Sequence, residues 1–227
     1  MKRNQLFTKQ MFLAEQVILD LPWKDREFYG NFLAQTYYFV CHSTRLLARS
    51  MSHFQTDREG LYRRFLSHMS EEDNHEKIAL SDLKKLGFSL ADFPESSYTR
   101  AFWQSQYYLA DTSKGTALLG YILFLEAVAV ETYPKLIEHL YKFHGKKCCQ
   151  FLKVHVEEDP DHVLHAIEEI QNLPEADKKE VWKNFEQTAK IYCEILKDAS
   201  ENKELSVPHS FMETNLAVEN NQQNTIN

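Results

Sequence analysis

Three side chains of metal-binding type recur at helical spacing in the stretch His155-Val-Glu-Glu-Asp159-Pro-Asp-His162. Since a helix turns by about 100° per residue, the side chains of His155, Asp159 and His162 would share an arc of about 60° on one face. Imidazole and carboxylate together are ligands for a first-row transition metal. Taken alone, this pattern is more typical of a solvated helix face, where polar residues gather anyway.

A second carboxylate and imidazole are three residues apart in Glu72-Asp-Asn-His75. Residues at this spacing are neighbours on a helix surface, so Glu72 and His75 could chelate one metal ion. Glu71, four residues before His75, is an equally good partner by geometry. The charged run around them is also typical of an exposed helix face, so this pair needs support from elsewhere in the chain.

Glu126 is a carboxylate in an apolar setting, the run LLGYILFLEAVAV. An ionised carboxylate that is buried without a partner is strongly destabilising. We therefore expect Glu126 to be neutralised, paired with a cation such as Arg, or bound to a metal ion. Glu131 is a weaker candidate for the same role, because the sequence becomes more polar from there.

Together these segments offer three carboxylates and three imidazoles: Glu72, Glu126, Asp159, His75, His155 and His162. Ferritin-like di-iron bundles use two Glu-x-x-His pairs and one Glu from each of two further helices. This chain has two carboxylate-x-x-His pairs and one lone Glu, with His155 in place of the second. Mixed nitrogen and oxygen ligands suit iron or manganese in oxygen chemistry.

The elements that must position these residues are expected to be helices. The chain of 227 residues has only 6 Gly and 6 Pro, which leaves little material for strands joined by tight turns. Apolar periodicity predicts an all-α bundle of about six to seven helices. The expected ranges are residues 1–20, 24–52, 56–85, 98–109, 114–144, 146–173 and 176–199.

Three residues are expected to interrupt or end these helices. Gly87 is the expected stop of the third helix, and Pro134 is expected to kink the fifth. Pro160 has two interpretations. It could open a new helix with Asp159 as the N-cap, or it could kink a continuous helix beside the site.

The length and net charge of the chain limit the classes of function that it could have. We expect one helical domain over residues 1–200 and a disordered, polar tail over residues 201–227. The net charge of −7 argues against a nucleic-acid partner. The longest apolar run, residues 117–130, is too short to span a bilayer, and the N-terminus does not read as a signal peptide. The four cysteines have no zinc-site spacing, so a reduced cytoplasm is the expected location.

Four blocks resemble the haem-oxygenase-like di-iron oxidase and oxygenase family: FLAQTYYFVCHSTRLLA, HMSEEDNHEKIALSDLKKLG, LLGYILFLEAVA and HVEEDPDHVLH. They span about residues 28–170. The resemblance implies a haem-oxygenase-like helical fold, two ferrous ions and the use of O2 on a small substrate such as a fatty acid, an amino acid or an amine. The implied iron ligands are Glu72, His75, Glu126, His155, Asp159 and His162. This chain departs from many relatives after the central Glu. Here Ala127 is followed by an unusually apolar run, which could shape a hydrophobic pocket.

Two other classes are compatible with the helical pattern. One is a metal-free enzyme or ligand-binding bundle, similar to thiaminases or to enzymes of quinone-cofactor synthesis. A thiaminase would need a positioned nucleophilic thiol, and Cys148 and Cys149 lie near an expected helix start, which lowers a thiol pKa. The other is a non-enzymatic interaction protein in which the metal ligands only stabilise the bundle. Manganese in place of iron, and a homodimer, are left open.

Overall fold

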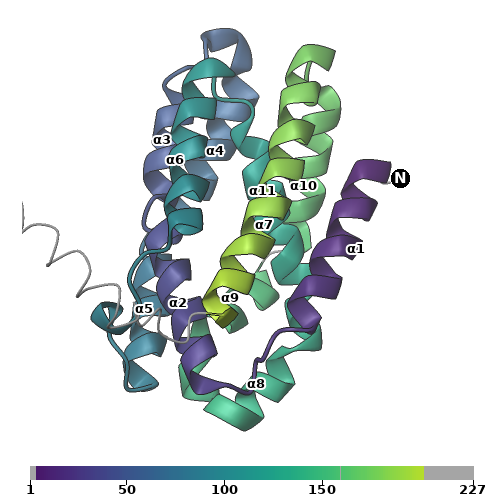
Figure 1. Cartoon of the computed structure of the whole chain (residues 1–227). Helices are drawn as coiled ribbons and strands as arrows, with labels where there is room; N and C mark the ends of the chain where they lie inside the picture. The colour runs from purple at the N-terminus through teal and green to yellow at the C-terminus, as the bar shows by residue number, and fades with distance from the viewer. Residues whose placement is uncertain (1–3, 159, 202–227) are drawn as a thin grey trace, which may run out of the picture.

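The computed structural model describes residues 4–158 and 160–201, and no side chain of residues 158–162. These residues form a bundle of α-helices (Figure 1). The helices are α1 (Gln5–Leu19), α2 (Arg26–Val40), α3 (Ser43–Met51), α4 (Glu59–Glu71), α5 (His75–Lys85), α6 (Ser97–Thr112), α7 (Leu118–Glu131), α8 (Ile137–His144), α9 (Gln150–Glu158), α10 (Pro160–Asn172) and α11 (Glu175–Glu201). Four single-turn 3-10 helices accompany them: η1 (Thr56–Arg58), η2 (Leu90–Asp92), η3 (Tyr133–Lys135) and η4 (Lys146–Cys148).

The all-α expectation is confirmed, but the expected six to seven helices are too few for the described part of the chain. The predicted helix 24–52 is divided into α2 and α3 at Cys41, and the predicted helix 56–85 is divided into α4 and α5. The predicted helix 114–144 begins only at Leu118, because Lys114 and Gly115 have φ angles of 54° and 83°, outside the helical region. Divided helices therefore account for much of the difference.

Of the three predicted helix interruptions, at Gly87, Pro134 and Pro160, the structure tests the first two. Gly87 follows α5 with φ of +83°, as a helix-terminating glycine does, so that expectation is confirmed. Pro134 lies in η3 and separates α7 from α8, which is a complete break where a kink was expected. Proline lacks the N–H that a continuous helix would require there. Residue 159 lies outside the described residues, so the role of Pro160 stays a prediction.

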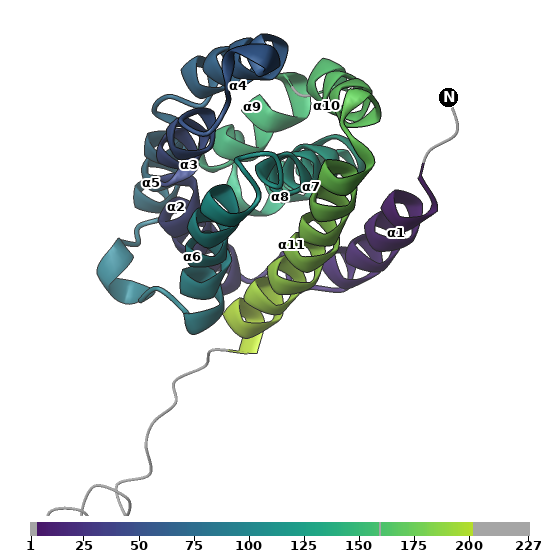
Figure 2. The same cartoon turned by 90° about the horizontal axis from the view of Figure 1, so that it is seen from above.

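Helix α7 lies in the middle of the bundle, with α2 to α6 on one side and α10, α11 and α1 on the other (Figure 2). Nearly every side chain along α7 is buried, as its apolar sequence predicts. Helix α7 approaches α11 closely at Gly120. A Cβ atom there would lie 2.1 Å from the backbone oxygen of Val181. Only a glycine allows α7 and α11 to pack at this distance.

The segments that carry the predicted ligands surround α7. Helices α9 and α10 pack directly on α7, α5 packs on α9, and α4 packs on α3, which itself contacts α7. The bundle thus brings Glu72 and His75, at the junction of α4 and α5, to the same region as His155 of α9 and Glu126 of α7. The division into a domain of residues 1–200 and a tail stays a prediction, and residues 202–227 lie outside the described part.

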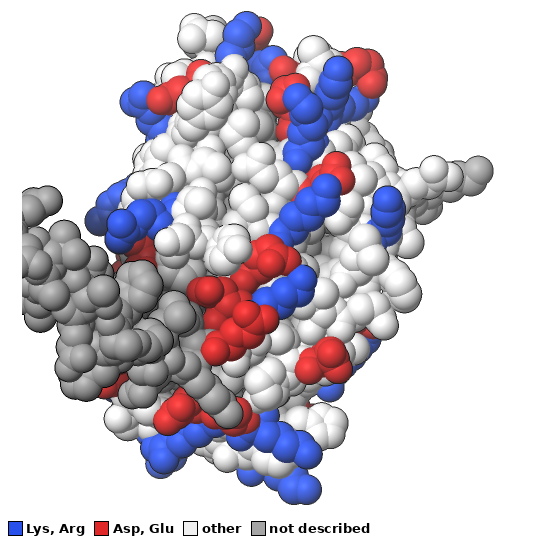
Figure 3. Space-filling view, viewed as in Figure 1, with Lys and Arg blue, Asp and Glu red and all other residues white. Residues whose placement is uncertain are grey.

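The surface carries charges of both signs. On the face of Figure 1, acidic and basic side chains interleave with large uncharged areas between them (Figure 3). A phosphate backbone would favour a continuous basic strip, and the expectation of no nucleic-acid partner stays a prediction. Within the described residues, no helix combines the length and the apolar character that crossing a lipid bilayer requires.

Candidate metal centre

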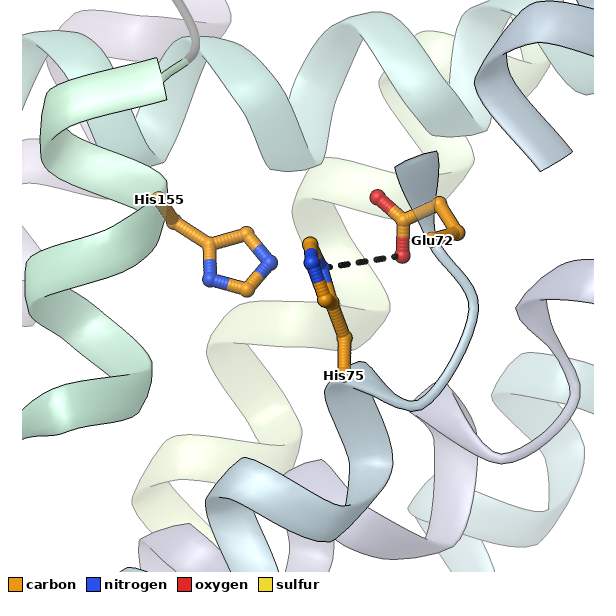
Figure 4. Close-up of side chains that lie close together, drawn as sticks. All are labelled: Glu72, His75 and His155. Atoms are coloured by element: carbon orange, nitrogen blue, oxygen red, sulfur yellow. Dashed lines mark ion pairs between the residues drawn. The ribbon is translucent and has the colours of Figure 1, made fainter. Parts of the chain in front are cut away.

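Glu72, His75 and His155 meet in space, although 80 residues separate the second from the third. One ligand atom of each lies within 4.8 Å of the ligand atoms of the other two. The His75 ring lies between the carboxylate of Glu72 and the ring of His155 (Figure 4). A carboxylate oxygen and two imidazole nitrogens are donors that suit Fe2+ or Mn2+. The structure therefore brings together three of the six predicted ligands.

The chain reaches this geometry through a break between α4 and α5. Glu72 is the C-cap of α4, Asn74 has a left-handed conformation with φ of 71°, and His75 begins α5. Asparagine is among the few residues that adopt this conformation readily. The expectation that Glu72 and His75 lie on one continuous helix was therefore wrong. Across the break, Oε2 of Glu72 lies 3.8 Å from Nδ1 of His75.

His155 is held in the orientation that metal binding needs. Its Nδ1 lies 2.8 Å from the carbonyl oxygen of Phe151, one turn earlier in α9. Because a carbonyl only accepts, the hydrogen bond assigns the proton to Nδ1 and leaves the lone pair on Nε2. Metal-binding histidines usually donate their second N–H in this way. The ring of His155 packs edge-on against the ring of His75, with centroids 4.9 Å apart.

Glu126 is buried and faces a histidine. Its carboxylate Oε1 lies 3.5 Å from Nδ1 of His68, on α4. The other nitrogen of His68, Nε2, lies 3.8 Å from Oε1 of Glu72. His68 therefore connects the carboxylate of Glu126 to the group formed by Glu72, His75 and His155. The cationic side chain that could pair with Glu126 in this structure is thus protonated His68, where an arginine had been considered.

The two adjacent glutamates at the end of α4 have different surroundings. The side chain of Glu71 is 41% exposed and accepts a hydrogen bond from the Ser67 hydroxyl at 2.9 Å. The side chain of Glu72 is 17% exposed and lies beside both His68 and His75. Glu72, and not Glu71, belongs to the group that could hold a metal ion. Glu131 is also outside this group.

The remaining predicted ligands are Asp159 and His162. Residue 159 lies outside the described residues, and of His162 the structure describes only its place in α10. Their role as ligands stays a prediction. His165, about one turn after His162, is exposed on α10, which makes it a poor candidate for the group at His75.

A comparison with known protein families identifies the family of this chain. Residues 30–192 match the model of a family described as iron-containing redox enzymes. The chain belongs to this family. The match covers α3 to α10 completely and most of α2 and α11, so it includes every predicted ligand. The resemblance inferred from the four sequence blocks is thereby confirmed at the level of the family, and no match was found among curated proteins.

Solved structures place this family member in the haem-oxygenase-like fold. A domain of unknown function from Shewanella denitrificans, with a haem-oxygenase-like fold, superposes with a TM-score of 0.77 at 18% identity, covering 88% of this chain and 92% of that one. A TenA homologue from Pseudomonas syringae gives 0.71 at 12% identity, with 86% and 90% covered. A TenA homologue from Pyrococcus furiosus gives 0.59 at 14% identity, with 86% and 100% covered. At these identities the likeness establishes the fold alone.

In this member of the iron-containing redox enzyme family, an apolar cavity adjoins the group formed by Glu72, His75 and His155. Its wall includes His68, Glu72, Glu126 and His155. Most other wall residues are aromatic or aliphatic, among them Phe32, Phe39, Leu47, Ile122, Leu125 and Leu152. No lysine or arginine is among the described residues of the wall. The hydroxyl of Tyr121, also in the wall, is buried and has no hydrogen-bond partner among the described residues.

The cysteines are not placed as nucleophiles. All four are free thiols, and only Cys41 is half-buried while the others are buried. Burial raises the pKa of Cys41 and of Cys148. Burial also raises the pKa of Cys149 and of Cys193 to about 11. A catalytic thiol needs a lowered pKa, so the expectation that the start of α9 could activate Cys148 or Cys149 was wrong.

Sequence reasoning did not select His68 as part of the site. It is 5% exposed, which is unusual for a histidine in a charged segment. The available signal was its spacing of four residues from Glu72, which places the two side chains on one face of α4. Burial lowers the pKa of His68, but the carboxylate of Glu71, 3.6 Å from its Nδ1, and the negative charges of Glu126 and Glu72 outweigh burial, so the pKa is raised.

This raised pKa predicts a pH-dependent stability of the metal-free protein. Since the unfolded histidine has a pKa of 6.5, protonated His68 stabilises the fold fully below that pH, and this contribution is lost as the pH rises through the folded pKa. The melting temperature of the wild type should therefore exceed that of a His68→Gln variant most at about pH 5.5, still above the usual glutamate range. A difference between the two proteins that does not change with pH would contradict this assignment.

Proposed function

We propose that this protein is a non-haem di-iron oxidoreductase that uses O2 to oxidise a small organic substrate. The observation that carries the proposal is the convergence of Glu72, His75 and His155 in a chain that belongs to a family of iron-containing redox enzymes. The tautomer of His155 adds independent support, because its Nδ1 proton is already taken by Phe151 and its Nε2 is left for a metal.

Each iron would take its ligands from more than one helix. Glu72, His75 and His155 would hold one ion. Glu126 would serve the second, together with Asp159 and His162 as predicted ligands. Manganese is the alternative metal. Bound ferrous ions supply the electrons that O2 needs to react with an organic molecule, which amino-acid side chains alone do poorly. The helices of the bundle would hold these ligand side chains in place, and the apolar wall of the cavity would exclude bulk water.

The cavity supports a substrate with an apolar body. Its wall offers aromatic and aliphatic contacts and, among the described residues, no lysine or arginine to pair with a carboxylate. An amino acid would leave its charged groups unpaired in this wall, which is unfavourable. Among the substrate classes considered, an apolar amine with its ammonium group toward Glu72 and Glu126 fits this wall best. The free hydroxyl of Tyr121 could bond to such a group.

The deciding experiment is an anaerobic titration with Fe2+ and metal analysis, followed by exposure to O2. The proposal expects about two irons per chain, as in other di-iron bundles, and a transient change in visible absorption after O2 is added. A protein that retains no iron after gel filtration, or iron that does not react with O2, would rule the proposal out. Replacing Fe2+ by Mn2+ in the same titration decides between the two metals.

A second candidate is a metal-free enzyme of the TenA kind, favoured only by the similarity of fold to two TenA homologues. The four thiols argue against a nucleophilic cysteine, because burial raises the pKa of each. Turnover of a substrate by rigorously metal-free protein would support this candidate. Loss of all turnover on treatment with a chelator, and its return with Fe2+, would reject it.

A further inference from the structure

The helix that carries His155 begins against a buried carboxylate of the helix that carries His75. Asp82 of α5 has no exposed surface (0%). Its Oδ2 accepts a hydrogen bond from the N–H of Phe151, the second residue of α9, at 2.8 Å. The first N–H groups of a helix have no partner within the helix and carry partial positive charge. Asp82 therefore caps α9 from a neighbouring helix.

Phe151 connects this cap to the candidate ligand. While its N–H donates to Asp82, its carbonyl oxygen accepts the Nδ1–H of His155 at 2.8 Å. The ring of Phe151 also packs on the ring of His155, with centroids 4.2 Å apart. Because Phe151 supplies the hydrogen bond of His155 and one of its two ring contacts, a shift in the backbone of Phe151 would move the imidazole.

Asp82 also relates the two histidine helices to each other. It follows His75 by seven residues, which is about two turns and returns to within about 20° on the same face of α5. The contact between His75 and His155 is therefore repeated, two turns further along α5, by the contact between Asp82 and Phe151. Two contacts at different levels fix both the spacing and the tilt of α5 against α9.

The carboxylate of Asp82 is compensated in its buried position. Burial raises its pKa, while the N–H of Phe151 and the ammonium of Lys85 act in the opposite direction. Nζ of Lys85 lies 3.2 Å from Oδ1, one turn later on α5. Oδ1 is thus engaged by Lys85 and Oδ2 by α9, so each oxygen has a partner. A buried charge that is paired and hydrogen-bonded in this way is held in one orientation.

We propose that Asp82 is a positioning residue of the metal centre, which sets His155 for metal binding by fixing Phe151 and the start of α9 against α5. This inference rests on the proposed function, since metal binding by His75 and His155 is itself proposed. Asp82 touches neither the metal group nor the cavity. It would act on affinity through the orientation of an imidazole and the distance between two helices.

The test is an Asp82→Asn variant titrated with Co2+, whose visible spectrum reports ligand geometry. Asparagine keeps the size of the side chain but removes the charge and one of the two acceptor oxygens, so its N–H2 group must face either the N–H of Phe151 or the ammonium of Lys85. We expect the affinity for Co2+ to fall by about 10-fold or more, in the range seen when residues that support a metal-bound histidine are replaced. We also expect the 15N resonances of His155 in the metal-free variant to show a mixture of tautomers, where the wild type has the proton on Nδ1.

Two control variants separate positioning from stability. Asp92→Asn removes another capping carboxylate, which bonds to Ser89 at the start of η2 and is exposed, and it should leave Co2+ affinity unchanged. Val181→Ala truncates a fully buried residue of α11. It should lower the melting temperature without changing Co2+ affinity or the tautomer of His155. Asp82→Glu, which retains the charge and the acceptor, should recover part of the affinity.

Wild-type Co2+ affinity in a folded Asp82→Asn protein would overturn the inference. If that variant does not fold, the wild type decides, because a proton on Nε2 of His155 would remove the link through Phe151. Failure of the proposed function looks different. Wild-type protein that binds no Co2+ would reject the metal centre, and the tautomer of His155 in metal-free protein would still report whether Asp82 positions it.

Discussion

Replacing His155 or His75 by alanine is expected to abolish tight binding of Fe2+ at the centre while the helical bundle remains folded. Each change removes one of three ligand atoms that lie within 4.8 Å of one another. Loss of a residue that only supports a ligand weakens metal binding by about 10–100-fold, so loss of a ligand should weaken it by at least about 100-fold. Metal analysis after equilibrium dialysis measures the effect, and circular dichroism checks the fold.

The matched control is His139→Ala. His139 is an exposed histidine of α8 and does not belong to the ligand group. This variant should bind as much iron as the wild type. Equal iron content in the wild type, His75→Ala and His155→Ala proteins would show that the group does not bind iron, whatever the family to which the chain belongs.

Replacing Gly120 by alanine is expected to destabilise the bundle core strongly. The new Cβ would lie 2.1 Å from the backbone oxygen of Val181 and 2.7 Å from the backbone nitrogen of Phe185. Both are backbone atoms, so only a shift of α7 against α11 can relieve the clash. Overpacking of this kind lowers stability by about 1–3 kcal/mol and occasionally more, and we expect the upper end of that range. For a chain of this size the melting temperature should fall by about 6–12 °C.

Gly60→Ala is the same chemical change as Gly120→Ala, but it is expected to raise stability where Gly120→Ala lowers it. Gly60 lies in the first turn of α4, and a Cβ atom there would meet nothing within 4 Å. Alanine favours the helix over glycine by about 1 kcal/mol, so this variant should be slightly more stable than the wild type. Thermal melts of both variants measure the difference in their stability. A Gly120→Ala protein as stable as Gly60→Ala would contradict the close packing of α7 and α11.

Local patterns predicted which segments are helical but not where the helices divide. The break at Glu72–Asn74 lies inside a charged run with no proline or glycine. The structural feature that marks it is the left-handed conformation of Asn74. Asparagine occurs in helices as well as in such turns, so its type alone did not reveal the break. By contrast, the stop at Gly87 was predicted correctly, because glycine at a helix end has few other interpretations.

The sequence by itself determined the all-α class, the family, and the segments that supply the candidate ligands. These depend on residue types and on short spacings, which are local properties. Only the tertiary structure decided that Glu72 rather than Glu71 faces His75 and that His68 connects Glu126 to the group. It alone showed that Asp82 caps the helix of His155. Apart from the contact of His68 with Glu72 within α4, these contacts join residues that are far apart in the chain or lie on either side of a helix break. Their geometry follows from how α4, α5 and α9 pack around α7.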